Sequence, residues 1–542
     1  MGNCLSFSNK RSQCLPIDTI FKFPSPIPSW PQGGGFASGY IDLGGLEVHQ
    51  ISSFDKIWET YEGGPDDLGA TFYQPSQIPD GFFILGYYSQ PNNKPLFGSI
   101  LVAKDNSQNQ ESPILIKPID YTLIWSSNCQ NGHGYIWLPE SPDGYRAIGY
   151  LITTTSDKPS LDKIRCVRSD FTDELETENL IWDSDGLNVY SSRPTNRGIK
   201  AQGVSVGTFM VENRSDIACL KNNNFLNSSS SSSMPNEIQI QALIQTYSPW
   251  IYLNPNEKYL PSSVNWYFEK GALLYTKGEE SNPVRIEKNG SNLPQGGSND
   301  GQYWIDLPID ETAKEEIKKG DLQSAQAYVH IKPMFGATFT DIVFWIFYPF
   351  NGPATAKIGL IDIPLGRIGE HIGDWEHLTL RISNFNGILQ KVYFSQHDKG
   401  TWVDSSDLEF YNGSNKPVAY SALNGHPFYP NPGLVLQGIG EIGIRNDTAK
   451  SSIVMDTGSR FSLVSAENID TIVEPPWLNY NREWGPKISY KLGDEVEKLE
   501  GELSGVMKSA FENLVKLFPS EIYGEEGPVG PKMKSSWNGD EK

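Results

Sequence analysis

The feature that most constrains the fold is an internal repeat in the first half of the chain. Two copies recur at an offset of 63–64 residues, each with an aromatic-x-Pro element, a Pro-Asp-Gly turn and an apolar run that ends in Gly. The aligned segments are Phe72-Tyr73-Gln74-Pro75 with Ile136-Trp137-Leu138-Pro139, and Pro79-Asp80-Gly81-Phe82 with Pro142-Asp143-Gly144-Tyr145. Repeats of this length made of short strands predict a pseudo-symmetric β unit, such as a three-sided prism.

A second recurring sequence motif suggests a third copy. Leu123-Ile124-Trp125-Ser126 precedes the second copy, and Leu180-Ile181-Trp182-Asp183 follows it. We therefore expect a degenerate third copy near residues 35–64 or near residues 182–211. Together the copies predict a β-prism-like repeat domain over residues 21–220.

A Ser- and Asn-rich stretch over residues 221–235 predicts a linker and a domain boundary. A long surface loop within one domain is the alternative. After a short helix at 236–247, residues 236–490 read as a β-sandwich domain. Its strand candidates are Ala327–Pro333, Ile342–Tyr348, His377–Ile382, Leu389–Ser395 and Gly433–Ile444. The predicted fold class is therefore mainly β, with two β-rich units.

The end of the chain reads differently. Over residues 491–518, apolar side chains recur at helical spacing, which predicts one long amphipathic helix packed on the domain, with binding to a partner as the alternative. Residues 519–542 combine Pro, Gly and charge and predict a disordered tail.

The first residues indicate a lipid anchor. Gly2 followed by Ser6 matches the requirement for N-myristoylation, and Cys4 lies where a second chain, palmitate, can be added. One myristoyl chain binds membranes only reversibly, so two are needed for stable residence. An unmodified N-terminus is the alternative reading. We expect residues 1–20 to form an acylated, flexible N-terminus, and the sequence shows neither a signal peptide nor an apolar run of about 18 residues.

The formal charge of −21 limits the classes of binding partner that this chain is suited to. A strongly acidic chain is a poor nucleic-acid binder, because phosphate neutralisation requires a basic surface. Five cysteines without CxxC spacing predict no structural disulfide and a reducing compartment. The expected place is the cytoplasmic face of the plasma membrane or of endomembranes, where the acyl groups contact membrane lipids.

The candidate site is the segment His371-Ile372-Gly373-Asp374-Trp375-Glu376-His377. If this segment is a strand, Asp374 and Glu376 share one face, because side chains two apart point the same way. Two carboxylates beside His371 suit a divalent cation, Ca²⁺ or Mg²⁺ before Zn²⁺, which would draw in His397 or His426. The alternatives are an edge-strand charge pair with exposed histidines, or an acid/base pair.

Residues from about 21 to 537 resemble the plant family known as vacuolar protein sorting-associated protein 62. The motifs that carry the resemblance are Tyr247-Ser248-Pro249-Trp250-Ile251-Tyr252-Leu253, Gly373-Asp374-Trp375-Glu376-His377, Tyr393-Phe394-Ser395-Gln396-His397, Asn424-Gly425-His426-Pro427-Phe428-Tyr429 and Trp484-Gly485-Pro486. The resemblance implies a link to vacuolar trafficking and possible trafficking proteins as partners.

Two partial resemblances add detail. The repeats look like the β-prism-like adaptor segments of large vacuolar-sorting lipid-transfer proteins. The segment 370–376 is similar to the Gly-His-Arg-His-Asp-Trp-Glu heptapeptide of necrosis- and ethylene-inducing peptide-like toxins, a family of β-sandwiches. That resemblance implies metal ligands at His371, Asp374 and Glu376, with Asn351 in place of the toxins' upstream Asp. Glu370 and Gly373 depart from the heptapeptide.

These observations favour a non-enzymatic, membrane-anchored adaptor that binds lipid or a trafficking partner and carries a divalent-metal site. The first alternative is a metal-dependent hydrolase or lyase that uses His371, Asp374 and Glu376, with His397 or His426 as acid/base. The second is a membrane-perturbing protein like the toxins.

Overall fold

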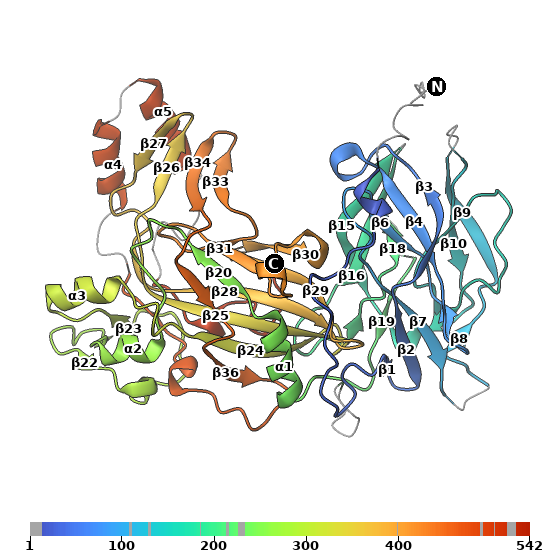
Figure 1. Ribbon diagram of the computed structural model, residues 1–542, viewed down its shortest axis with the longest axis horizontal. Coiled ribbons are helices and arrows are strands. Elements are labelled where there is room, and N and C mark those ends of the chain that lie inside the picture. The colour runs from blue at the N-terminus through green and yellow to red at the C-terminus, as the bar shows by residue number, and fades with distance from the viewer. Residues whose placement is uncertain are drawn as a thin grey trace.

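The computed structural model describes residues 14–542 except 108–110, 128–131, 185, 213–215, 226–232, 398, 488–491, 503–504 and 517–526. Two β-rich halves lie side by side, and the C-terminus ends between them (Figure 1). The prediction of a mainly β fold is confirmed. Among the described helices, none has the length and apolar character needed to cross a bilayer.

Beside a four-stranded sheet and two other three-stranded sheets, the described N-terminal half contains three three-stranded antiparallel sheets that correspond to one another, one in each repeat. They consist of β3 (Phe54–Glu59), β4 (Ala70–Pro75) and β6 (Tyr88–Pro91); β9 (Asp120–Ser126), β10 (Tyr135–Glu140) and β12 (Leu151–Thr153); and β15 (Leu175–Ser184), β16 (Leu187–Pro194) and β18 (Phe209–Val211). Shorter strands complete this half: β1 (Tyr40–Asp42), β2 (Leu46–Ile51), β5 (Phe83–Ile84), β7 (Ile100–Asp105), β8 (Leu115–Ile116), β11 (Tyr145–Arg146), β13 (Cys166–Arg168), β14 (Thr172–Asp173), β17 (Gly203–Val204) and β19 (Cys219–Lys221).

One tryptophan from each repeat packs at the centre of this half. The ring centroids of Trp58, Trp125 and Trp182 lie 5.2–5.7 Å apart in edge-to-face contact, a favourable geometry for aromatic rings. The third copy therefore lies over β15–β18, the second of the two positions that the sequence left open. The echo around Trp58 escaped the sequence comparison because only Ile57-Trp58 survives of the Leu-Ile-Trp motif.

The C-terminal half is built on a six-stranded sheet in the order β30-β29-β28-β25-β24-β36. Its strands are β24 (Ala327–Met334), β25 (Phe339–Asn351), β28 (His371–Ser383), β29 (Leu389–Gln396), β30 (Lys399–Asp404) and β36 (Phe461–Ala466). One face shares a large apolar core with α1 (Glu237–Tyr247) and a second sheet of β20 (Trp250–Leu253), β31 (Val418–Ser421), β32 (Phe428–Tyr429) and β35 (Val454–Asp456). The other face packs against α2 (Val264–Glu269) and the small sheet β21 (Leu273–Thr276), β22 (Val284–Arg285) and β23 (Tyr303–Asp306).

A further four-stranded sheet, in the order β27-β26-β34-β33, projects from this half (Figure 1). Its strands are β26 (Thr355–Ile358), β27 (Ile361–Pro364), β33 (Gly433–Ile439) and β34 (Ile442–Thr448). The sequence predicted a single strand over 433–444, and that prediction is wrong. Gly440 adopts a φ of 62° and turns the run into a hairpin.

The predicted long helix is two helices, α4 (Leu492–Glu502) and α5 (Val506–Val515). Gly505 has a φ of 55°, which an α-helix cannot continue through. Side chains of both helices pack on β26 and β34, so the apolar stripe serves the domain's own core. The remaining helix, α3 (Glu311–Lys318), lies on the surface with three lysine–glutamate pairs along it.

The predicted disorder of the tail is wrong for residues 527–542, while 519–526 fall outside the described residues. Trp537 is only 4% exposed and stacks on His330 with ring centroids 3.8 Å apart. Lys332 Nζ donates to the carbonyl oxygens of Ser536, at 2.7 Å, and Gly539, at 3.2 Å. Charge and glycine suggested disorder, but here Asp540 and Glu541 are paired with buried side chains of the C-terminal half. We call residues 527–542 the C-terminal strap.

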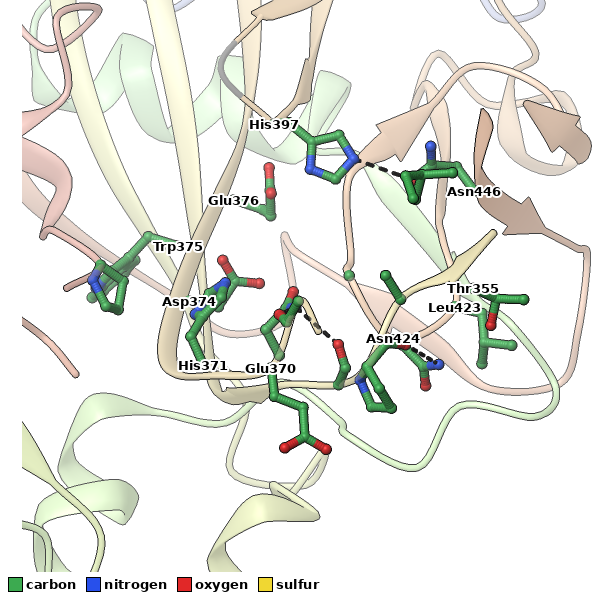
Figure 2. Close-up of a pocket in the computed structure, with 18 of the residues that line it drawn as sticks. Thr355, Glu370, His371, Asp374, Trp375, Glu376, His397, Leu423, Asn424 and Asn446 are labelled. Atoms are coloured by element: carbon green, nitrogen blue, oxygen red, sulfur yellow. Dashed lines mark hydrogen bonds between the residues drawn. The ribbon is translucent and has the colours of Figure 1, made fainter. Parts of the chain in front are cut away.

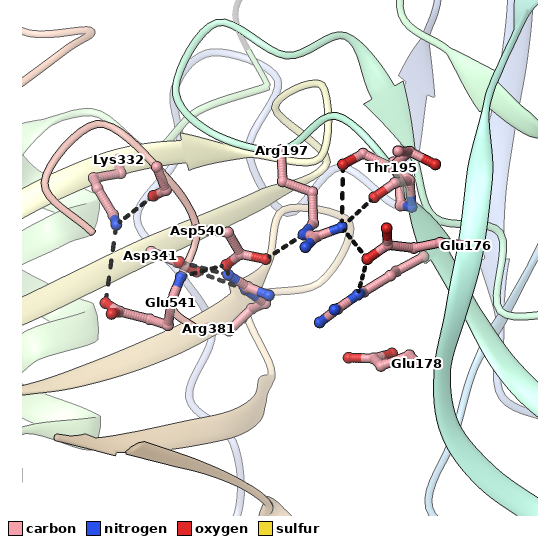
Figure 3. Close-up of polar contacts among 12 residues, drawn as sticks. Glu176, Glu178, Thr195, Arg197, Lys332, Asp341, Arg381, Asp540 and Glu541 are labelled. Atoms are coloured by element: carbon pink, nitrogen blue, oxygen red, sulfur yellow. Dashed lines mark hydrogen bonds and ion pairs between the residues drawn. The ribbon is translucent and has the colours of Figure 1, made fainter. Parts of the chain in front are cut away.

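The strap also joins the halves. Asp540 binds Arg381 of β28 at 2.6 Å and Arg197 of the N-terminal half at 3.0 Å, as Figure 3 shows. The predicted boundary between the halves also differs from the structure. Phe23 and Trp30, placed in the repeat domain by sequence, pack against Tyr247 of the C-terminal half. The chain thus crosses between the halves at both ends.

The predicted linker is only partly described. Residues 226–232 lie outside the described residues. Gly2 and Cys4 lie outside them as well, so the lipid anchor stays a prediction. Of the remainder, Asn222 and Met234 are buried, and the Asn222 amide donates to the Gly336 carbonyl at 2.6 Å. Both ends of this stretch are therefore buried against β24–β25 and the turn between them.

Candidate functional site

A cavity of roughly 620 Å³ lies in the C-terminal half, where β25 ends and β28 begins. All four predicted metal ligands line it: Asn351, His371, Asp374 and Glu376. His397 lines the cavity as well, whereas His426 lies fully buried behind Asp374. Figure 2 shows His371, Asp374, Glu376 and His397 around the open space.

The strand pairing explains how the carboxylates reach the cavity. In the antiparallel register of β28 with β25, Asp374 lies opposite Tyr348 and Glu376 opposite Ile346. Residues that alternate with these two pack elsewhere. Trp375 joins the aromatic cluster of Trp477 and Trp484, in accord with the two-residue period of a strand.

A buried imidazole holds Asp374 in place. His426 Nδ1 donates to Asp374 Oδ2 at 3.0 Å, and His426 Nε2 lies 3.8 Å from Glu257 Oε2. Tyr348 covers one face of the imidazole, with ring centroids 3.8 Å apart and almost parallel. His426 is therefore clamped between two carboxylates and an aromatic ring, which suits an orienting group rather than a mobile acid or base.

The electrostatics follow from this clamp. Burial opposes a charge on His426, but its two carboxylate partners outweigh burial and raise the pKa of His426 to about 9. Burial also opposes ionisation of Asp374, and the hydrogen bond from His426 overcomes it, so the pKa of Asp374 is lowered. At neutral pH the pair is an imidazolium and a carboxylate.

The pKa of Glu376 is shifted in the opposite direction from that of Asp374. Burial, reinforced by the negative charge of Asp374, raises the pKa of Glu376 to about 8. Its Oε2 accepts a hydrogen bond from the Ser395 hydroxyl, and Lys534 of the strap acts against the shift from across the cavity. Two carboxyl groups from one strand thus line the same cavity with pKa values pushed apart.

The two other predicted ligands present lone pairs. His371 Nδ1 donates to the Gly373 carbonyl at 3.0 Å, which leaves the lone pair on Nε2. Such a backbone contact commonly orients a metal-binding histidine. The Asn351 amide donates to the carbonyls of Gly369, at 2.8 Å, and Gly352, at 3.1 Å, so its Oδ1 stays an acceptor.

Within the described part of the chain, no three His, Cys, Asp or Glu side chains stand close enough together to grip a metal ion directly. The donor set nevertheless fits a hard cation, because carboxylate and amide oxygens predominate. The positive charge of a cation would also offset the cost of burying two carboxyl groups beside each other. Ca²⁺ and Mg²⁺ keep water molecules in the shell, so water would complete the coordination.

One departure from the toxin heptapeptide has a clear cause. Gly373 adopts a φ of 71°, and a Cβ there would lie 2.4 Å from the carbonyl oxygen of Trp484. A histidine is therefore excluded at this position. Glu370, the other departure, lines the cavity, but Figure 2 shows its carboxylate pointing away from Asp374.

Sequence reasoning missed three residues of the site. Glu257 lies 117 positions before Asp374 and follows β20 without any motif of its own. Asn446 lines the cavity and contacts His397 Nε2 at 3.3 Å. Lys534 was assigned to a disordered tail, and no local signal marked it as a cavity residue.

Comparisons with known proteins agree on the family. The family described as "Vacuolar protein sorting-associated protein 62" matches residues 17–541. The chain is 23% identical over 282 residues to "Vacuolar protein sorting-associated protein 62" of Saccharomyces cerevisiae, covering 44% of this chain and 58% of that protein. It is 22% identical over 239 residues to the same organism's "Putative vacuolar protein sorting-associated protein TDA6", covering 36% and 47%. The chain thus spans about half the length of these relatives.

Solved structures are similar only at low overlap. GNIP1Aa from Chromobacterium piscinae covers 38% of this chain and 40% of its own, with 16% identity and a TM-score of 0.28. Necrosis and Ethylene inducing Protein 2 from the causal agent of cocoa's Witches Broom disease covers 35% and 67%, with 16% identity and a TM-score of 0.19. Because one family pattern matches nearly every residue, the chain belongs to the vacuolar protein sorting-associated protein 62 family.

Proposed function

We propose that this protein is a membrane-tethered adaptor in vacuolar protein sorting whose C-terminal cavity holds a divalent cation, Ca²⁺ or Mg²⁺ before Zn²⁺. Family membership and the names of the yeast relatives support the sorting role. Acyl chains on Gly2 and Cys4 would supply the tether. His371, Asp374, Glu376 and Asn351 would hold the cation.

The convergence of the four residues on one cavity carries the metal proposal. Asp374 and Glu376 are both buried, and each disfavours the charge of the other. A divalent cation between them would favour both ionised forms. The clamp of His426 and Glu257 holds Asp374 in one orientation, which reduces the ordering required on binding.

Calorimetric titration of the full-length protein with CaCl₂, and separately with MgCl₂, tests this proposal. We expect saturable binding of one ion, weakened at least about tenfold in Asp374→Asn and Glu376→Gln. Glu370→Gln is the matched control, since it lines the same cavity but points away. Unchanged titration curves in the two ligand variants would refute the site.

The tether has its own test. Gly2→Ala should lower the membrane-bound fraction of the protein in cell fractionation, because the acidic body is repelled by anionic lipid. An unchanged membrane-bound fraction would remove the acyl chains from the account and leave the cavity untouched.

The same cavity supports a second function, hydrolysis. Its specific support is the pair of pKa shifts: Asp374 is held ionised, and Glu376, with a pKa of about 8, retains a proton at neutral pH. A base and an acid on one strand are a common catalytic arrangement, and His397 lines the same space. Turnover of ester, phosphoester or glycoside substrates that Glu376→Gln abolishes would favour this function. The absence of turnover with the metal-loaded protein would exclude it for those classes.

A further inference from the structure

The projecting sheet ends in two hairpin turns that lie against each other. β26 and β27 are joined by Gly359-Leu360, and β33 and β34 by Gly440-Glu441. The Gly359 amide donates to the Glu441 carbonyl at 3.0 Å, which binds the two turns together. Figure 1 shows this end of the sheet standing clear of the main body beside α4 and α5.

Four isoleucines form a row across this end of the sheet. In the strand register, Ile361 lies opposite Ile358, Ile358 opposite Ile442, and Ile442 opposite Ile439. Directly opposed residues point to the same face. The two inner side chains pack on the core that includes α5, while the two outer ones remain in solvent.

Three side chains at this end are strongly exposed: Leu360 at 96%, Ile439 at 69% and Ile361 at 49%. We call these three residues the apolar tip. Isolated exposed apolar side chains are ordinary on protein surfaces, but three of them at one end of one sheet, in line with the row of isoleucines, indicate an interaction site. Burying one such side chain contributes about 1.5–3 kcal/mol, so the apolar tip offers a substantial docking surface.

We propose that the apolar tip inserts into the surface of a zwitterionic phospholipid bilayer. The two turns lie at the end of the projecting sheet, and exposed apolar side chains lie on both of its edge strands, β27 and β33. An extended peptide added to the edge of β33 would leave Leu360, on the opposite side of the sheet, uncovered. A bilayer is broad and deformable and covers both edges together.

The charge distribution favours a zwitterionic surface over an anionic one. The strand ends 357–362 and 437–442 contain only three charged residues, and Lys357 pairs with Asp362 at 3.6 Å. Asp362 is further neutralised by Arg445 at 2.5 Å. The tip is therefore nearly neutral in a chain of charge −21, and anionic lipid would repel the body without attracting the tip. The contact requires no acyl chain and so goes beyond the proposed tether.

Co-sedimentation with phosphatidylcholine vesicles tests the inference, using full-length Gly2→Ala protein so that no acyl chain takes part. We expect Leu360→Asp/Ile439→Asp to weaken vesicle partitioning at least about tenfold, since two apolar side chains are lost from the contact. Both positions are exposed, so the variant should unfold at the same temperature as its parent. Leu434→Asp/Val435→Asp, exposed at the far end of β33, is the control and should change partitioning less than about twofold.

The fluorescence emission of an environment-sensitive dye attached to the Leu360→Cys variant should shift to the blue when phosphatidylcholine vesicles are added. Phosphatidylserine in the vesicles should make this shift smaller. The inference is overturned if Gly2→Ala protein does not bind vesicles, if the tip variant binds like its parent, or if both double variants lose binding equally. Equal loss would assign the contact with the vesicles to the whole edge of β33 and not to the apolar tip. None of these results touches the acyl tether or the cavity, which have separate tests.

Discussion

At the scale of single residues, the site is built around a carboxylate whose orientation is fixed by its neighbours. Asp374 is fixed by His426, which Glu257 and Tyr348 hold in turn. Such a buried ion pair is retained at an energetic disadvantage relative to apolar packing. Its presence beside a cavity therefore points to a positioning role.

Replacing the imidazole tests this arrangement. His426→Ala leaves Asp374 and Glu257 buried without their shared cation, and we expect a loss of about 3 kcal/mol in the free energy of unfolding, measured with urea. His133→Ala, an exposed histidine of the N-terminal half, should change stability by less than about 0.5 kcal/mol. Similar stability of the two variants would show that the contacts of His426 with Asp374 and Glu257 contribute nothing to the stability of the fold.

Sequence reasoning reached part of this site and not the rest, for a physical reason. The two-residue period of a strand was enough to place Asp374 and Glu376 on one face. His426, which contacts Asp374, lies 52 positions after it, and Glu257, which contacts His426, lies 117 positions before it, so no local pattern encodes these contacts. Three-dimensional pairing of β20 with β31 brings those segments together.

At the scale of elements, the C-terminal strap is the least predictable part of the fold. Its composition of Pro, Gly and charged residues matches that of disordered tails. The strap is ordered because its charges meet charges from both halves. Asp540 contacts Arg381 and Arg197, and Glu541 Oε2 lies 3.1 Å from His377 Nε2.

The strap predicts a dependence of stability on pH. Burial opposes ionisation of Asp540 and Glu541, but the charges of Arg381 and His377 dominate and lower the pKa of each to about 2. Unfolded carboxyls titrate near pH 4. Stability from these groups is therefore fully present above about pH 4 and is lost as the pH falls to about 2, by about 2–3 kcal/mol for each group.

Calorimetric unfolding between pH 5 and pH 2 measures this effect. Asp540→Asn/Glu541→Gln should be less stable than the wild type at pH 5, and the two proteins should converge near pH 2. A constant difference across the range would mean that these carboxyls do not titrate with folding.

The anchor of the strap predicts a separate effect. Trp537→Ala removes a buried aromatic ring from the slot beside His330, and we expect a loss of about 3 kcal/mol. Amide exchange of residues 527–542 should become faster. Met533→Ala, at an exposed position of the same strap, should leave both measurements unchanged. Slow exchange of the strap in the tryptophan variant would contradict the proposed anchoring.

At the scale of the whole molecule, the two halves are joined by contacts from both chain ends. Arg197 is central to this junction, since its guanidinium contacts Glu176 at 2.8 Å and Asp540 at 3.0 Å (Figure 3). The internal repeat predicted the architecture of the N-terminal half, because each copy forms one of three corresponding three-stranded sheets. It could not predict the junction, because Asp540 and Arg381, which complete the contacts of Arg197, lie outside the repeats.

Loss of that contact should uncouple the halves. Arg197→Ala leaves Asp540 with a single cation, and we expect the calorimetric transition to broaden or split as the N-terminal half unfolds independently. Lys56→Ala, which breaks only an exposed pair with Glu59, should keep the shape of the wild-type transition. A single unchanged transition in Arg197→Ala would show that the remaining contacts, among them the Lys94–Asp404 and Lys391–Glu178 ion pairs, hold the halves together without Arg197.

The central claim is that one cavity binds a divalent cation through residues brought together from β25 and β28. Its most direct test is a crystal structure of the full-length protein soaked in MnCl₂, with anomalous difference density recorded at the manganese edge. The account predicts a peak within the cavity, in contact with Asp374 and Glu376 and with water in the remaining positions. A cavity without a peak, or a peak bound only outside it, would contradict the claim.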